Sequence, residues 1–270
     1  MRPRTIRVLS WMACAAAGAC LTPGAEASPW NRDAGDLFTI TRNAWFAADG
    51  GAAADGTERS FGQASAELYT EYGVSDRIMV GGKVIYAWQT TEETLENGAR
   101  REDRLSGFAE AEGFVQGQVA RWEGGALAVI ATVAAPTKTT SRTIDGRAFE
   151  RDARAGAAVL AGWNLGAGFA TVRAGPDVSL GADAHSLRVE GTLGRRVGER
   201  TVLLGEAYLT QSLGGAEPGG ADFSVLRAGP SVVLPVWRTV RVQVGATFDV
   251  TGENVDLGAS GFVAFWVGGL

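Results

Sequence analysis

The sequence contains few of the residues on which metal sites and nucleophilic enzymes depend. It has two cysteines, Cys14 and Cys20, and a single histidine, His185, among its 270 residues. Both cysteines lie close to the N-terminus, so a chain that loses an N-terminal leader contains no thiol. Disulfide scaffolds, paired-cysteine zinc sites and cysteine nucleophiles are then excluded, and so is a histidine-rich metal cluster.

Long apolar runs and an excess of positive charge are also missing. The formal net charge is -5, and the basic side chains are arginines except for Lys83 and Lys138. This balance gives no indication of a nucleic-acid partner. Beyond the leader, the longest uncharged and mostly apolar stretch, 126–136, is far shorter than the ~20 residues of a transmembrane helix. No nucleotide-binding or EF-hand fingerprint occurs, and we expect no cofactor and no metal.

Residues 1–27 have the composition of a secretory signal peptide. Arginines within residues 2–7 precede an apolar run at 8–21, and small residues at 25–27 predict cleavage before Ser28. In an alternative reading, Ala17-Gly18-Ala19-Cys20 loosely resembles a lipoprotein processing site and would place a lipid on Cys20. Either way, residues 28–270 are predicted to be exported as one domain.

Glycine is abundant, with 38 residues, and apolar side chains recur at every second position. In 238–250 six apolar side chains follow one another on one parity, from Val240 to Val250, while Arg241, Gln243 and Asp249 take the other parity. Residues 63–72 and 77–89 alternate in the same way. Frequent glycine and this period of two predict β-strands that are apolar on one face.

The alternation continues through the chain and predicts twelve antiparallel strands. Short turns alternate with longer polar or glycine-rich loops, and an even count returns both termini to one side, which is the pattern of outer-membrane barrels. We therefore predict an all-β fold, a transmembrane antiparallel β-barrel in the outer membrane. The alternative is a soluble or lipid-anchored β-rich periplasmic binding protein. The strands are expected at 36–47, 61–73, 77–89, 104–121, 126–138, 151–164, 169–181, 184–197, 201–213, 221–235, 238–250 and 255–269.

Aromatic residues fall near the ends of these segments, where lipid headgroups would lie. They predict two girdles of the kind that flank the lipid-facing band of a barrel. Those near the short turns are Tyr72, Trp122, Trp163, Phe169, Trp237 and Trp266, and those near the longer loops are Trp45, Phe61, Trp88 and Phe149.

The stretch Leu68 to Gly82, LYTEYGVSDRIMVGG, resembles hairpins of Gram-negative outer-membrane barrel proteins. Porin-like proteins and transporters assigned to a phenol-degradation meta-pathway carry a similar Tyr-Glu-Tyr-Gly-aliphatic-Thr/Ser-Asp-Arg stretch at a short turn. The resemblance implies an outer-membrane barrel that is inserted by the barrel assembly machinery, with lipid and lipopolysaccharide as its surroundings. The segment 257–270 resembles the terminal strand that such proteins present, although it ends in Leu270 rather than Phe.

If the apolar parity faces lipid, the polar parity lines the lumen. The sequence then predicts passive, porin-like passage of small polar solutes or a structural role in the membrane. Two arrangements remain open: an acidic wall opposite a basic wall, or acids and arginines that pair and close the lumen. The predicted pore-lining residues are Glu67, Glu71, Lys83, Glu110, Glu112, Arg154, Arg173, Arg188, Glu190, Glu206, Arg227 and Arg241.

Enzymatic readings have little support in the sequence, and we predict no catalytic residue. His185 and Ser186 are adjacent, so on a strand they point to opposite faces and do not form a nucleophile and base together. Glu110 and Glu112 share a face, but paired lumen acids are more common than glycosidase sites. One feature has no explanation at this level: VRAGPDVSL at 172–180 is echoed by LRAGPSVVL at 226–234, on strands that are predicted to run in opposite directions.

Overall fold

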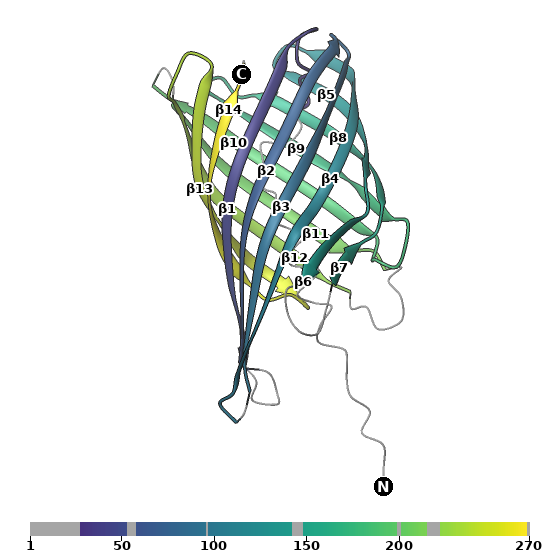
Figure 1. The fold of residues 1–270 in the computed structure, drawn as a ribbon. Helices are drawn as coiled ribbons and strands as arrows, with labels where there is room; N and C mark the ends of the chain where they lie inside the picture. The colour runs from purple at the N-terminus through teal and green to yellow at the C-terminus, as the bar shows by residue number, and fades with distance from the viewer. Residues whose placement is uncertain are drawn as a thin grey trace.

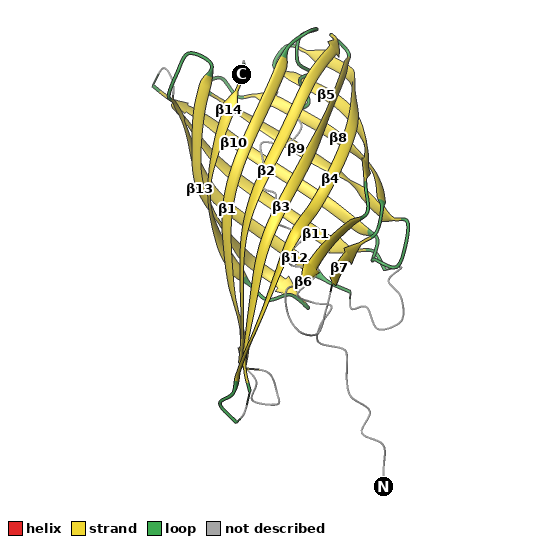
Figure 2. Ribbon diagram, in the orientation of Figure 1, coloured by secondary structure: helices red, strands yellow, loops and turns green. Residues whose placement is uncertain are grey.

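The chain forms a closed antiparallel β-barrel (Figure 1). The computed structural model describes residues 28–52, 58–95, 97–141, 148–198, 201–214 and 222–268, and the predicted leader lies outside these ranges. Strand β1 pairs with β2 on one side and with β14 on the other, which joins the two edges of the sheet. Figure 2 shows strands joined by loops and turns. No helix in the described ranges is long and apolar enough to cross a membrane.

Twelve strands make the wall, as predicted, and β6 and β7 form a hairpin beside it. The predicted strand at 126–138 ends early, at Ala134, because Pro136 has no N–H to donate to a ladder. Beyond the proline, β6 continues the pairing of β5 with β4 and then forms a hairpin with β7. The bounds are β1 (Leu37–Ala52), β2 (Glu58–Ser75), β3 (Ile78–Thr94), β4 (Arg100–Trp122), β5 (Gly125–Ala134), β6 (Thr137–Ser141), β7 (Ala148–Arg151), β8 (Arg154–Asn164), β9 (Gly168–Ser179), β10 (Ser186–Val197), β11 (Thr201–Ser212), β12 (Ser224–Pro235), β13 (Val240–Glu253) and β14 (Gly258–Val267).

The two ends of the barrel differ. Tight turns join β2 to β3, β4 to β5 and β8 to β9 at the end that we call the short-turn end, where β1 begins and β14 finishes. At the opposite, long-loop end, β1 to β4 extend well beyond the other strands (Figure 1). These four strands have 16, 18, 17 and 23 residues, whereas the remaining wall strands have 10 to 14. In outer-membrane barrels short turns face the periplasm, so the long sheet is on the extracellular side.

The outer face of the wall is apolar and exposed. Along β5, for example, Val129 and Val133 are 46% and 65% exposed, whereas the alternating residues are buried. Such a surface matches acyl chains rather than water. The predicted location in the outer membrane therefore agrees with this fold, and a soluble periplasmic protein does not.

The aromatic girdles are present in part. The outward-facing and exposed members are Tyr72, Trp122, Trp163 and Trp237 at the short-turn end, and Trp45 and Trp88 toward the other end. The prediction was wrong for Phe61, Phe169 and Trp266, whose side chains pack inside the barrel. These three have the inward parity of their strands, which their position near a strand end did not reveal. The side chain of Phe149 lies outside the described residues.

The repeated Arg-Ala-Gly-Pro sequence builds the same local structure twice. Gly175-Pro176 lies on β9 and Gly229-Pro230 lies on β12. The ladder to one neighbouring strand is interrupted at each pair, to β8 in the first case and to β13 in the second. A Cβ on Gly175 would lie 1.9 Å from the carbonyl oxygen of Ala157, and one on Gly229 would lie 1.9 Å from that of Ala246. Each glycine thus permits a close approach of the neighbouring strand beside a proline that cannot donate a hydrogen bond. The echo reflects a shared local wall geometry, which does not depend on strand direction.

Candidate functional site in the barrel interior

The alternation of the strands places the polar parity inside the barrel, where most of the predicted pore-lining residues meet partners. Of these, Glu67, Glu71, Lys83, Glu110, Glu206 and Arg227 are buried. Glu112, Arg154, Arg173, Arg188 and Glu190 are partly buried on β4, β8, β9 and β10. Arg241 differs, because it lies at the start of β13 beside the short-turn end, opposite Trp266 and Pro235 in the strand register.

A chain of ion pairs runs along one side of the interior wall. Lys83 Nζ on β3 lies 2.9 Å from Glu110 Oε1 on β4, and Glu110 Oε2 lies 3.7 Å from Arg154 Nη2 on β8. Arg154 Nη1 in turn lies 2.9 Å from Asp177 Oδ2 on β9, which is 2.8 Å from Arg188 Nη2 on β10. We call this chain the ion-pair belt.

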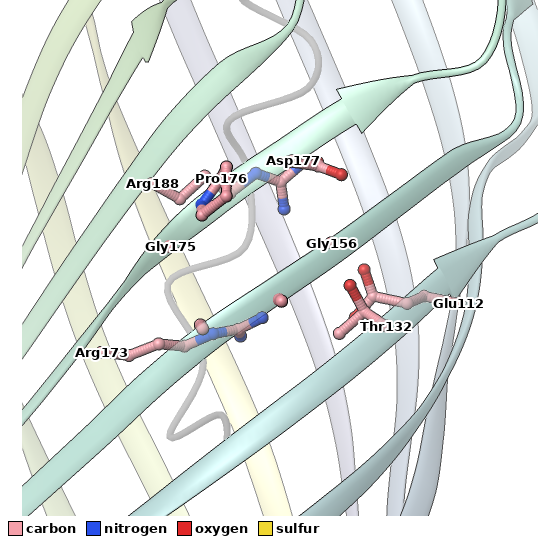
Figure 3. A pocket seen from close by; sticks show the side chains of 10 residues that line it. Glu112, Thr132, Gly156, Arg173, Gly175, Pro176, Asp177 and Arg188 are labelled. Carbon is pink, nitrogen blue, oxygen red and sulfur yellow. The ribbon is translucent and has the colours of Figure 1, made fainter.

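Two further charged residues adjoin the ion-pair belt. Arg173 Nη1 on β9 lies 3.8 Å from Glu190 Oε2 on β10. Figure 3 shows Arg173, Arg188 and Asp177 with Glu112 and Thr132, around a small cavity that lies beside the Gly175-Pro176 break in the wall. The cavity measures about 10 Å³, which is enough for about one water molecule. The wall around this cavity is therefore lined by charged and polar side chains.

The opposite side of the interior is held by hydrogen bonds around one carboxylate. Glu206 on β11 accepts a hydrogen bond from Ser231 Oγ at 2.9 Å and one from Tyr208 Oη at 3.0 Å. Gln243 Nε2 donates to Ser231 Oγ at 2.8 Å, while its Oε1 accepts from Trp266 Nε1 at 3.2 Å. These contacts join β11, β12, β13 and β14 into one polar network.

A separate ion pair lies nearer the long-loop end. Arg227 Nε on β12 donates to Asp249 Oδ1 on β13 at 2.7 Å, and the Arg227 guanidinium stacks over the ring of Phe46 at 5.0 Å. Asp249 also accepts a hydrogen bond from the backbone of Gly258 at 2.9 Å. The pair thus fixes β12, β13 and the start of β14 relative to one another.

Toward the short-turn end the interior contains a large apolar cluster beside the buried polar side chains of Glu71 and Gln116. One connected cluster of buried side chains draws on nine wall strands, and it includes Phe38, Met79, Phe114, Leu160 and Trp266. The sequence reasoning did not identify this cluster, because it assigned apolar residues to lipid and polar residues to the lumen. The available signal was a change of pattern: near the short turns, both parities of several strands carry large apolar residues.

The interior ion pairs bear on the two predicted arrangements, an acidic wall opposite a basic wall or acids that pair with arginines. In the ion-pair belt, the pairs join residues on adjacent strands or on strands one apart, such as Lys83 with Glu110 and Glu110 with Arg154. Acid and base therefore alternate along the wall in the ion-pair belt. Acids and arginines are thus paired along this part of the wall.

The candidates considered for catalysis have structural partners. His185 Nδ1 accepts a hydrogen bond from the backbone N–H of Ser179 at 3.2 Å, in the connection between β9 and β10. Glu110 is surrounded by Lys83, Arg151 and Arg154. Among the described residues, no group of three or more His, Cys, Asp or Glu side chains is arranged to hold a metal ion.

The protein is similar to known proteins in its structure but not in its sequence. No protein-family model and no curated protein matches the sequence. Among solved structures, an outer membrane channel from Pseudomonas putida F1 is similar with a TM-score of 0.61 and 12% identity, covering 92% of this chain and 100% of that chain.

Two autotransporter barrels are similar as well. The translocator domain of NalP from Neisseria meningitidis gives a TM-score of 0.56 at 13% identity, over 88% of this chain and 90% of that chain. The transport unit of AIDA-I from Escherichia coli gives 0.55 at 9% identity, over 94% and 97%. At such low identities the likeness establishes the fold, that of outer-membrane β-barrels, which confirms the fold class predicted from the sequence.

Proposed function

We propose that the protein is a passive outer-membrane channel for small polar solutes. The observation that carries this proposal is the ion-pair belt, Lys83, Glu110, Arg154, Asp177 and Arg188, inside a barrel whose outer face is apolar. The short-turn half shows that this barrel can fill its interior with Phe, Met and Leu. Replacing buried ion pairs with well-packed apolar residues is often neutral or stabilising, so stability alone does not account for the belt.

Ionisable side chains at membrane depth commonly mark a path for solutes or ions. Because acids and arginines alternate in the belt, a passing solute meets donors and acceptors of both signs within a few ångströms. Such a lining favours small polar or zwitterionic solutes over apolar ones. The similar structure from Pseudomonas putida F1 is described as a channel, which is consistent with the proposal.

The test is single-channel recording of the purified, folded protein in planar lipid bilayers. Folding is checked first by heat-modifiable migration in SDS gels after membrane fractionation. We expect discrete conductance steps, and the Arg173→Glu variant is expected to shift the ion selectivity toward cations. The matched control is Arg195→Glu, because Arg195 is exposed on β10 with the outward parity.

The competing function is a closed barrel with a structural role. It is favoured if the folded native protein gives no conductance steps. Equal selectivity changes for Arg173→Glu and Arg195→Glu would also contradict a path along the belt. The barrel assembly machinery and lipopolysaccharide are part of this proposal as biogenesis partner and surroundings.

A further inference from the structure

Strand β1 differs from the other wall strands in the side chains that it presents to lipid. Its outward residues between the two girdles are Thr39, Thr41 and Asn43, and they alternate with inward residues that are buried. Thr70 on β2 lies beside Thr39 in the strand register and has the outward parity too. We call these four residues the polar patch, and β1 is the purple strand at the front of Figure 1.

The polar patch lies at the depth of the hydrocarbon core. Tyr72, a girdle residue at the short-turn end, is the register partner of Leu37. Trp45 belongs to the other girdle, so the patch residues of β1 lie between the two. On β13, by comparison, the outward positions from Val240 to Val250 are valine, alanine or phenylalanine. Lipid-facing positions of barrel strands are ordinarily apolar, and the polar patch is therefore poorly matched to acyl chains.

Asn43 is the least favourable member of the patch in lipid. Its side chain is exposed, and within the described part of the chain no hydrogen bond satisfies its side-chain amide. Hydrocarbon offers neither donors nor acceptors, so an amide that faces lipid loses the hydrogen bonds that it makes in water. A protein surface that supplies both a donor and an acceptor to Asn43 recovers this free energy.

The residues beside the patch are small. In the strand register Asn43 lies beside Ala66 on β2, and Trp45 lies between Ala64 on β2 and Gly261 on β14. A Cβ on Gly261 would meet no atom within 4 Å, and Gly261 is not among the glycines with positive φ. Neither the packing of this barrel nor the backbone conformation thus requires glycine there. Small residues next to polar ones are typical of surfaces at which membrane proteins approach each other closely.

We propose that the polar patch is the interface of a homodimer, in which β1 of one copy packs against β1 of a second copy. A two-fold axis normal to the membrane places the same surface on both sides of the contact, so this surface must be self-complementary. The Asn43 amide and the threonine hydroxyls each carry a donor and an acceptor, and they therefore pair with their own counterparts. The patch has no charged side chain, so like charges do not oppose each other across the axis.

The tilt of the strands limits this contact to a small area. Barrel strands are inclined by about 35–45° to the barrel axis, so two copies of β1 that face each other cross at about 70–90°. The contact is then centred on a few residues of each strand, with Thr41 and Asn43 in the middle of the patch. The dimer forms whether or not the lumen conducts, and the inference is therefore independent of the proposed channel.

The first experiment is cysteine crosslinking in outer-membrane vesicles. The chain without its leader contains no cysteine, so Thr41→Cys introduces a single thiol at the patch. We expect a short bismaleimide to convert most of this variant into a dimer. The matched control is Val172→Cys, which should stay monomeric, because Val172 is exposed on β9, halfway around the twelve-stranded wall from β1. Equal crosslinking of the two variants, or adducts of Thr41→Cys with a different protein, would overturn the dimer.

A second pair of variants tests the close approach of the two walls. Gly261→Val adds a side chain at an open position, so the barrel should fold like the native chain, which heat-modifiable migration checks. Sedimentation equilibrium in mild detergent should show a native dimer and a dissociation constant at least about tenfold higher for the variant. In the control, Gly205→Val on β11, the new Cβ also meets no atom within 4 Å, and the dimer should be unchanged. A dimer that tolerates Gly261→Val would refute the close approach.

The polar contacts are tested by Thr41→Val/Asn43→Leu. These substitutions make the outer face more apolar, so folding in lipid should be retained. We expect the dimer to dissociate at least about tenfold more readily, because the hydrogen bonds of the amide and the hydroxyl are lost. Asn43→Gln keeps an amide and should retain part of the affinity. If the double variant dimerises as tightly as the native chain, or if the native chain is monomeric in both assays, the interface is refuted.

Discussion

Replacing Glu110 with Gln should destabilise the folded barrel strongly. Glu110 is 3% exposed on β4 and lies within ion-pair distance of three cations. The Nζ of Lys83 is 2.9 Å away, and terminal nitrogens of Arg154 and Arg151 are 3.7 and 3.8 Å away. Neutralising one carboxylate therefore leaves three interior cations without their shared counter-charge.

The size of the effect follows from distance and burial. With an effective dielectric constant of about 20, opposite charges at 2.9 Å attract by about 6 kcal/mol before desolvation is counted. Removing one partner of a buried pair typically costs about 3–5 kcal/mol. We expect Glu110→Gln to lower the free energy of unfolding by about that amount. The double variant Lys83→Met/Glu110→Gln should recover part of the loss, because the unpaired Lys83 is gone.

The assay is urea unfolding of the barrel in lipid vesicles, followed by tryptophan fluorescence and by the heat-modifiable gel shift. The control is the exposed pair between Arg104 and Glu102, with side chains 72% and 43% exposed. Glu102→Gln should change stability by less than about 1 kcal/mol. If Glu110→Gln also stays within about 1 kcal/mol of the native chain, the belt is solvated and the argument from burial is wrong.

Three further outcomes are expected. Val159→Arg, on the outer face of β8, should cost about 2–4 kcal/mol in the same urea assay, and a neutral effect would contradict its lipid exposure. Gly229→Ala should cost about 1–3 kcal/mol because the new Cβ meets the carbonyl of Ala246, whereas Gly62→Ala, with open space around it, should be neutral. N-terminal sequencing of protein from the membrane fraction should begin at Ser28; any other start would refute the predicted cleavage site.

The wall of the barrel could be predicted from the sequence more completely than its interior. Period-two alternation located the twelve wall strands within a few residues, because every second side chain of each strand faces lipid and is therefore apolar. It did not reveal the interruption at Pro136, after which β6 continues the pairing with β4 and forms a hairpin with β7. Alternation assigns each residue to one face of its strand, but it does not predict which residues of other strands that residue contacts.

The interior depends on contacts that local patterns do not encode. Glu110 on β4 meets Arg154 on β8 across the intervening strand β5, and the apolar cluster joins side chains from nine wall strands. The inward apolar side chains near the short turns, such as Phe38 and Leu160, belong to one cluster although they lie far apart in the sequence. Such long-range contacts follow from the closed topology, which becomes defined only after β1 pairs with β14.

The position of residues 28–36 also bears on how the protein folds. These residues are continuous with β1, and β1 forms the seam with β14 that completes the cylinder. They contact strands that come later in the chain, since Gln116 Nε2 on β4 donates to Ser28 O at 2.8 Å. The first residues described therefore reach their final position only after strands that follow them in the sequence have formed.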